Sequence, residues 1–204
     1  MSQFLHKFDA SRLLITAIDS LLAAHNLTRS QLNFIAVNQG PGPFTTLRTV
    51  LSTVNGLAYA LSVPLIGVDG LAAFADEVYT GGVTAVMLNA FNHDLYFALK
   101  IGDTIVDRGC KNGAMLIAQL KSALSGKPIF CVGNRVELWR SALEAELSGQ
   151  LIIPDPMPQT VSIKQVAAVA QRQWQEGVPG STSLMPTYLK AHSSSLRCGA
   201  TSSG

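Results

Sequence analysis

A loop rich in glycine and proline is the part of the sequence whose residue types and spacing come nearest to a chemical motif. It consists of Gly40, Pro41, Gly42, Pro43, Phe44, Thr45, Thr46, Leu47 and Arg48. A loop that leads into a helix can offer backbone N–H groups to a phosphate. The P-loop motif, however, needs a Lys-Ser/Thr pair after its second glycine, where this chain has Phe44-Thr45. Pro41 and Pro43 also lack N–H groups, so we expect a structural loop.

The residue types that usually perform catalysis are scattered along the chain. No histidines have HxxxH or HExxH spacing, no cysteines form a CxxC pair, and no nucleophile-elbow sequence is present. The histidines and cysteines are His6, His25, His93, His192, Cys110, Cys131 and Cys198. We therefore expect no catalytic residue, no metal site and no cofactor. The role of Arg48 stays open between binding an anion, bonding a carbonyl and facing the loop.

Charge is scarce in this chain. Of its 204 residues, 15 are basic and 13 acidic, which gives a net charge of +2. Charged residues make up 14% of the chain, against an average of about 25%. The near balance provides no electrostatic footprint for nucleic acid, and the low charge favours a surface covered by a partner subunit. No signal-peptide or membrane-span pattern is present, so we expect a cytoplasmic protein.

Two helices are expected on either side of the loop, at residues 10–25 and 45–62. The first carries apolar residues on one stripe and is apolar over much of its remaining surface. The second carries apolar residues in a heptad pattern and small residues four apart on another face. The apolar residues are Leu14, Ile18 and Leu21 on the first helix and Leu47, Val50, Val54, Leu57 and Leu61 on the second. The small residues are Ser52, Gly56 and Ala60. The heptad pattern suits either a partner interface or this chain's own core.

The remaining pattern predicts an α/β protein in two halves. Short buried strands are expected at residues 34–37 and 65–68, and Gly81-Gly82 marks a break after a helix at 71–78. Later strands are expected at 83–88, 95–101, 104–108, 128–132 and 151–153, with helices at 112–125, 135–147 and 162–175. Three hairpin strands followed by alternating helices and strands favour a ribonuclease-H-like second half. We expect the halves at residues 1–80 and 81–190, and a disordered tail at 191–204.

The order of these segments resembles the TsaB (YeaZ) family, the dimerisation subunit of the bacterial tRNA threonylcarbamoyladenosine system. The most specific string is GPG-x-FT-x-LR at residues 40–48, and the resemblance extends to Lys190. The supporting segments are Arg12-Leu13-Leu14, Ile35-Ala36-Val37, Gly56-Leu57-Ala58, Gly67-Val68, Leu71-Ala72-Ala73, Asp94-Leu95-Tyr96 and Pro186-Thr187-Tyr188-Leu189-Lys190.

The resemblance implies an actin/Hsp70-like ATPase (ribonuclease-H-like) fold of two halves, without catalytic activity of its own. It implies pairing through the first two helices with a TsaD-like catalytic subunit, on which a TsaE-like ATPase docks. That complex transfers a threonylcarbamoyl group to adenosine 37 of tRNA, so this chain would meet tRNA indirectly; a homodimer is also possible. The partner interface would consist of Leu14, Ile18, Leu21, Leu47, Val50, Val54, Leu57 and Leu61.

The chain also departs from the family pattern. Pro43 and Thr46 replace a serine and a glycine, and Asn89 and Phe91 stand where aspartate and arginine are common. The family's opening β-hairpin region, whose loop holds nucleotide phosphate in this superfamily, is missing, so a truncated first half is expected.

Two other interpretations of the protein's function stay open. One is a nucleotide-dependent or protease-like hydrolase of the same superfamily, and the other is a degenerate remnant.

Overall fold

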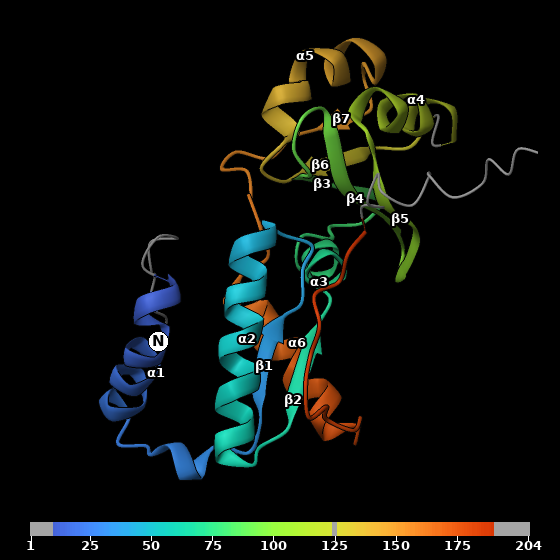
Figure 1. Cartoon of the computed structure of the whole chain (residues 1–204). Helices are drawn as coiled ribbons and strands as arrows, with labels where there is room; N and C mark the ends of the chain where they lie inside the picture. Colours follow the sequence, from blue (N-terminus) through green and yellow to red (C-terminus); the bar gives the residue numbers. More distant parts are fainter. Residues whose placement is uncertain (1–9, 124–125, 190–204) are drawn as a thin grey trace, which may run out of the picture.

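The computed structural model describes residues 10–123 and 126–189 (Figure 1). The predicted tail at 191–204 lies outside the described residues, as do His6, His192, Cys198 and Lys190. The helices are α1 (Ala10–Ala24), α2 (Phe44–Leu61), α3 (Gly70–Glu77), α4 (Gly113–Ala123), α5 (Val136–Glu146) and α6 (Ile163–Gln175), with a 3-10 turn η1 (Arg29–Gln31). The strands are β1 (Ile35–Asn38), β2 (Leu65–Val68), β3 (Val83–Asn89), β4 (Asp94–Ile101), β5 (Thr104–Asn112), β6 (Ile129–Val132) and β7 (Leu151–Ile152). Among the described residues, no helix combines the length and the hydropathy that a membrane span needs.

A parallel pair of strands, β1 and β2, forms the small sheet of the first half, with Ile35 opposite Leu65. The helix α2 connects these strands and packs on Val37 and Leu65. On the same strand as Leu65, Ile66 and Val68 pack instead with residues of α6. Since successive side chains of a strand point to opposite faces, α2 and α6 cover opposite faces of the sheet.

The second sheet is mixed, with the strand order β5-β4-β3-β6-β7. Strands β3, β4 and β5 are antiparallel, and β6 and β7 add in parallel, which confirms the predicted meander and its α/β continuation. The expected end of β5 at Arg108 is wrong, because pairing with β4 continues until Asp94 lies opposite Asn112. The helix α4 then begins at Gly113, where the Asn112 side chain accepts a hydrogen bond from the Ala114 N–H.

The largest core lies between the second sheet and the helices α4 and α5. Met87 and Phe97 of the sheet pack there with Leu116 of α4 and Leu143 of α5, all fully buried. Val86, the neighbour of Met87, faces the other side of the sheet and packs against α3. The second half therefore has helices on both faces of its sheet, as the first half does.

After the second sheet, the chain returns to the first half. The helix α6 packs against β1, β2 and α3, and the rings of Phe34 and Trp174 lie 5.2 Å apart. Ser181 then forms an antiparallel bridge with Leu65 of β2. The expected boundary at residues 80 and 81 counts α6 with the second half, which is its place in chain order. Its contacts nevertheless run to the first-half sheet.

Ion pairs connect α3 to the second sheet. Asp69 accepts hydrogen bonds from the N–H groups of Leu71 and Ala72 at the start of α3 and also pairs with Arg108 of β5. Lys100 of β4, whose side chain is only 7% exposed, bonds Asp76 at 2.5 Å. A buried ammonium group needs such a partner to offset its loss of hydration, so this pair fixes α3 against β4.

Candidate functional site

The glycine–proline loop (residues 40–43) joins β1 to α2 and is held by backbone hydrogen bonds. Gly40 has a φ of +111°, and a Cβ there would lie 2.9 Å from Cδ2 of Leu47, so the position requires glycine. Its N–H donates to Asn38 Oδ1 at 2.8 Å, and its carbonyl accepts the Gly70 N–H at 2.9 Å. The Gly40 N–H is thus already engaged by the side chain of Asn38 at the end of β1. This geometry favours the structural interpretation of the motif.

The C-terminal segment (residues 181–189), red in Figure 1, runs on from its bridge with β2 and is hydrogen-bonded to Gln39, just before this loop, and to Asn55 of α2. The Thr187 N–H donates to the Gln39 carbonyl at 2.9 Å, and Gln39 Nε2 donates to the Met185 carbonyl at 3.0 Å. Asn55 of α2 holds Leu184 with two hydrogen bonds of 2.9 Å, one to its carbonyl and one from its N–H. Sequence reasoning missed Asn55, because a polar residue inside a helix gives no sign of a backbone partner 129 residues away.

Arg48 links the two most recognisable motifs of the chain. Its Nε donates to the Tyr188 hydroxyl at 2.9 Å, and its guanidinium carbon lies 4.1 Å from the centre of the Phe44 ring. The rings of Phe44 and Tyr188 are stacked, with centroids 4.7 Å apart and an interplanar angle of 17°. A guanidinium over an aromatic face is an attractive cation–π arrangement. Arg48 therefore fastens the C-terminal segment to the start of α2: it faces Phe44 of the motif, and its hydrogen bond goes to a tyrosine hydroxyl rather than to a carbonyl.

An apolar groove of about 760 Å³ lies between α1, α2 and β1. It brings together most of the residues predicted for the partner interface: Leu14, Ile18, Leu21, Leu47, Val50, Val54 and Leu57. Leu61 does not line it. Val54 and Leu57 are only 5% and 8% exposed, and Val54 packs in a core cluster with Val37 and Leu65. The heptad residues of α2 thus face this chain's own sheet and the groove.

The opposite side of α2, here called the outer face, is exposed. Ser52, Gly56 and Ala60 lie on it, and the neighbouring Tyr59 is 87% exposed. Sequence reasoning noticed the small residues but missed Tyr59. The signal that could have found it is an aromatic residue outside the heptad positions of an otherwise apolar helix. This uncharged surface is open to a second protein.

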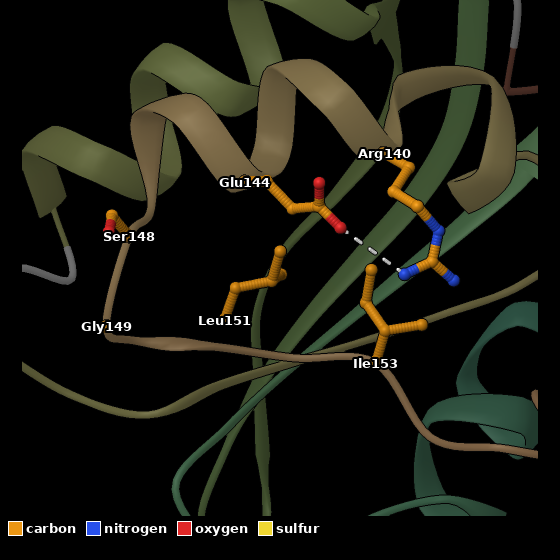
Figure 2. Close-up of a pocket in the computed structure, with 6 residues that line it drawn as sticks. All are labelled: Arg140, Glu144, Ser148, Gly149, Leu151 and Ile153. Atoms are coloured by element: carbon orange, nitrogen blue, oxygen red, sulfur yellow. Dashed lines mark ion pairs between the residues drawn. The ribbon is translucent and has the colours of Figure 1, made fainter.

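Elsewhere, the shifted pKa values of Glu137 and Cys131 have ordinary structural causes. Figure 2 shows a notch beside α5 in which Arg140 points toward Glu144, 3.5 Å away; Arg140 also bonds Glu137 at 2.5 Å. The hydrogen bonds from Arg140 hold the pKa of Glu137 below its usual value. Burial raises the pKa of the Cys131 thiol to about 12, which disfavours the reactive thiolate. Within residues 10–123 and 126–189, no three His, Cys, Asp or Glu residues gather as a metal site would require.

Comparison with known families defines the class of this protein. Residues 9–176 match the family model described as TsaD, tRNA N6-adenosine threonylcarbamoyltransferase. The match covers most of the chain, so the chain belongs to this family of TsaD-type domains. The solved structure of YeaZ from Pseudomonas aeruginosa has a TM-score of 0.66 and 18% identity, covering 88% of this chain and 86% of that one. A second Pseudomonas aeruginosa structure, described as similar to peptidase YEAZ, has a TM-score of 0.65 and 19% identity over 88% and 83%.

Curated relatives narrow the assignment. An uncharacterized protein of Mycobacterium leprae is 39% identical over 77 residues, 38% of this chain and 21% of that protein. The Haemophilus influenzae tRNA threonylcarbamoyladenosine biosynthesis protein TsaB is 26% identical over 95 residues, 45% of this chain and 40% of that protein. The aligned part spans less than half of either relative. The YeaZ-like fold and these matches agree with the resemblance to TsaB and YeaZ proteins and with the predicted actin/Hsp70-like fold.

Proposed function

We propose that this protein is a non-catalytic scaffold subunit in the cytoplasmic synthesis of threonylcarbamoyladenosine at adenosine 37 of tRNA. It pairs with a TsaD-like catalytic subunit, and the relatives named TsaB support its place in this process. The observation that carries the scaffold role is the exposed, uncharged outer face of α2. Arg48 is the only charged residue between Arg29 and Asp69, and it is bonded to Tyr188.

The physical chemistry of the outer face suits a helix of another protein. Ser52, Gly56 and Ala60 have small side chains at helical spacing, so a second backbone can approach α2 closely. Tyrosine is enriched among the residues that dominate binding energy at interfaces, and Tyr59 stands exposed beside this stripe. The heptad residues lie on the opposite side of α2, where Val54 packs on the sheet and Leu57 is buried at the groove.

The other partners in this proposal come from the resemblance to the TsaB family. A TsaE-like ATPase docks on the pair rather than on this chain alone, and tRNA is reached through the catalytic subunit. The net charge of +2 supports that indirect contact, since a nucleic-acid surface is normally strongly basic. In the absence of the catalytic subunit, the same outer face is available for a homodimer.

The test compares two exposed glutamates. Gly56→Glu places a charge on the outer face of α2, whereas Ala168→Glu places one on the exposed side of α6. Titration calorimetry with the TsaD-like protein of the same organism should show complete loss of binding for Gly56→Glu and unchanged binding for Ala168→Glu. Tyr59→Ala should weaken binding by at least about tenfold, as interface anchors do. Equal binding by all three variants, each with native circular dichroism, would refute the proposed surface.

A further inference from the structure

A second groove lies on the second half of the molecule, between α4 and α5, the two helices at the top of Figure 1. Its volume is about 540 Å³. At one end, Gly113 of α4 lies against Trp139 of α5, so closely that a Cβ on Gly113 would be 2.2 Å from the indole Cε2. At the other end, Lys121 in the last turn of α4 pairs with Glu146 of α5 at 2.7 Å. The two helices therefore run side by side in the same direction.

The groove is lined mainly by small apolar side chains. Three alanines, Ala114, Ala118 and Ala142, line it together with Ile117 and Trp139. The distance at which helices pack depends on the side chains at their contact. Because alanine projects little beyond the helix backbone, another helix can approach α4 and α5 closely here.

Large apolar side chains stand exposed beside the alanines. Met115 of α4 is 66% exposed and Leu138 of α5 is 54% exposed. They are the sequence neighbours of Ala114 and Trp139, which line the groove. Exposed apolar side chains that gather at one place mark an interaction surface, and methionine and tryptophan are enriched at protein interfaces.

The walls of the groove select a helix as its occupant. Both walls are helices, whose interior N–H and C=O groups are already bonded within each helix. An extended peptide would leave its own backbone groups without partners against such walls, whereas a helix satisfies them internally. From Ala114 to Lys121, α4 rises by about 10 Å at about 1.5 Å per residue, which matches about two turns of a bound helix.

From this geometry we infer that the groove between α4 and α5 binds an amphipathic helix of another protein, with large apolar side chains at i, i+4 and i+7. Among the described residues that line the groove, Lys121 and Glu146 alone are charged, and they are paired at one end. The partner helix therefore carries charge only beside this pair, because a charge elsewhere would lose its hydration without gaining a partner. This surface is separate from the outer face of α2 and does not rest on the pairing proposed there.

The fluorescence of Trp139 tests the inference on the full chain. The sequence contains two tryptophans, so Trp174→Phe leaves Trp139 as the single reporter. The probe is a short capped peptide of alanine and glutamine that carries leucine at i, i+4 and i+7. Its control has the same composition, with the leucines spaced so that they do not share one helix face. The probe should change the Trp139 emission saturably, and the control should bind about tenfold or more weakly.

Two variants keep this test specific. Ala118→Glu places a charge in the groove and should weaken binding of the probe by at least about tenfold, whereas Ala168→Glu on the exposed side of α6 should leave it unchanged. Equal affinities for the two peptides, equal affinities of the two variants, or an emission that does not saturate would overturn the inference. So would a chain that dimerises by itself in light scattering and becomes monomeric in Ala118→Glu, because a second copy would then occupy the groove.

Discussion

Replacing Asn55 by alanine should release the C-terminal segment from α2. The Asn55 side chain makes two hydrogen bonds of 2.9 Å to the backbone of Leu184. Each such bond contributes roughly 1 kcal/mol net, so Asn55→Ala should destabilise the attachment by about 2 kcal/mol. That energy corresponds to roughly a 30-fold increase in the open population of the segment.

Hydrogen exchange with peptide-level mapping measures this opening directly. Residues 181–189 should exchange up to about 30-fold faster in Asn55→Ala, with little change in the second sheet. The matched control is Thr53→Ala, because the Thr53 hydroxyl bonds only the Thr49 carbonyl within α2 in this structure. If both variants leave residues 181–189 as protected as in the unmodified chain, the role assigned to Asn55 is refuted.

Three further predictions concern the core, a thiol and the acid limit of stability. Val54→Asp should lower the free energy of unfolding, measured by urea denaturation, by about 3–5 kcal/mol, because it buries an unpaired charge. Ser52→Asp, on the exposed outer face, should change that free energy by no more than about 0.5 kcal/mol. Equal stabilities of the two variants would contradict the inward orientation of Val54. Cys131, whose pKa burial raises to about 12, should resist iodoacetamide at pH 8 until the protein unfolds, and native-state labelling in a peptide map would be the contrary result. Hydrogen bonds, first from Gln119 and then from Lys111, lower the pKa of Asp107 in the folded protein. The ionised Asp107 therefore contributes fully to the free energy of unfolding above its unfolded pKa of about 3.9. That contribution is lost as the pH falls through the lower pKa of the folded state. The free energy of unfolding of Asp107→Asn, measured by urea denaturation at several pH values, should therefore fall less steeply in acid than that of the unmodified chain. An equal dependence on pH in both proteins would contradict the role of the Asp107 carboxylate.

The parts of the fold that depend on local pattern were predictable. The helix expected at residues 45–62 is α2 (Phe44–Leu61), and the strand expected at 83–88 is β3 (Val83–Asn89). Helical and strand periodicities are properties of neighbouring residues, so one sequence suffices for them. The end of β5 was missed because it depends on pairing with β4 rather than on its own residues.

The candidate site was predictable only in part, since its contacts join distant segments. The heptad pattern found the apolar side of α2, but the sequence did not say that Val54 faces β1 rather than a partner. The hydrogen bond from Arg48 to Tyr188, 140 positions away, and the return of α6 to the first sheet are tertiary features. Periodicity carries no information about them, because it reports only which face of an element is apolar.

The central claim, that this chain is a scaffold for a TsaD-like catalytic subunit, is tested most directly by size-exclusion chromatography with light scattering. The chain, of 21.7 kDa, is measured alone and after mixing with the TsaD-like protein of its own organism. The account predicts a new species whose mass is the sum of one copy of each protein, and its loss with Gly56→Glu. A folded chain that elutes unchanged beside that protein would contradict the scaffold function.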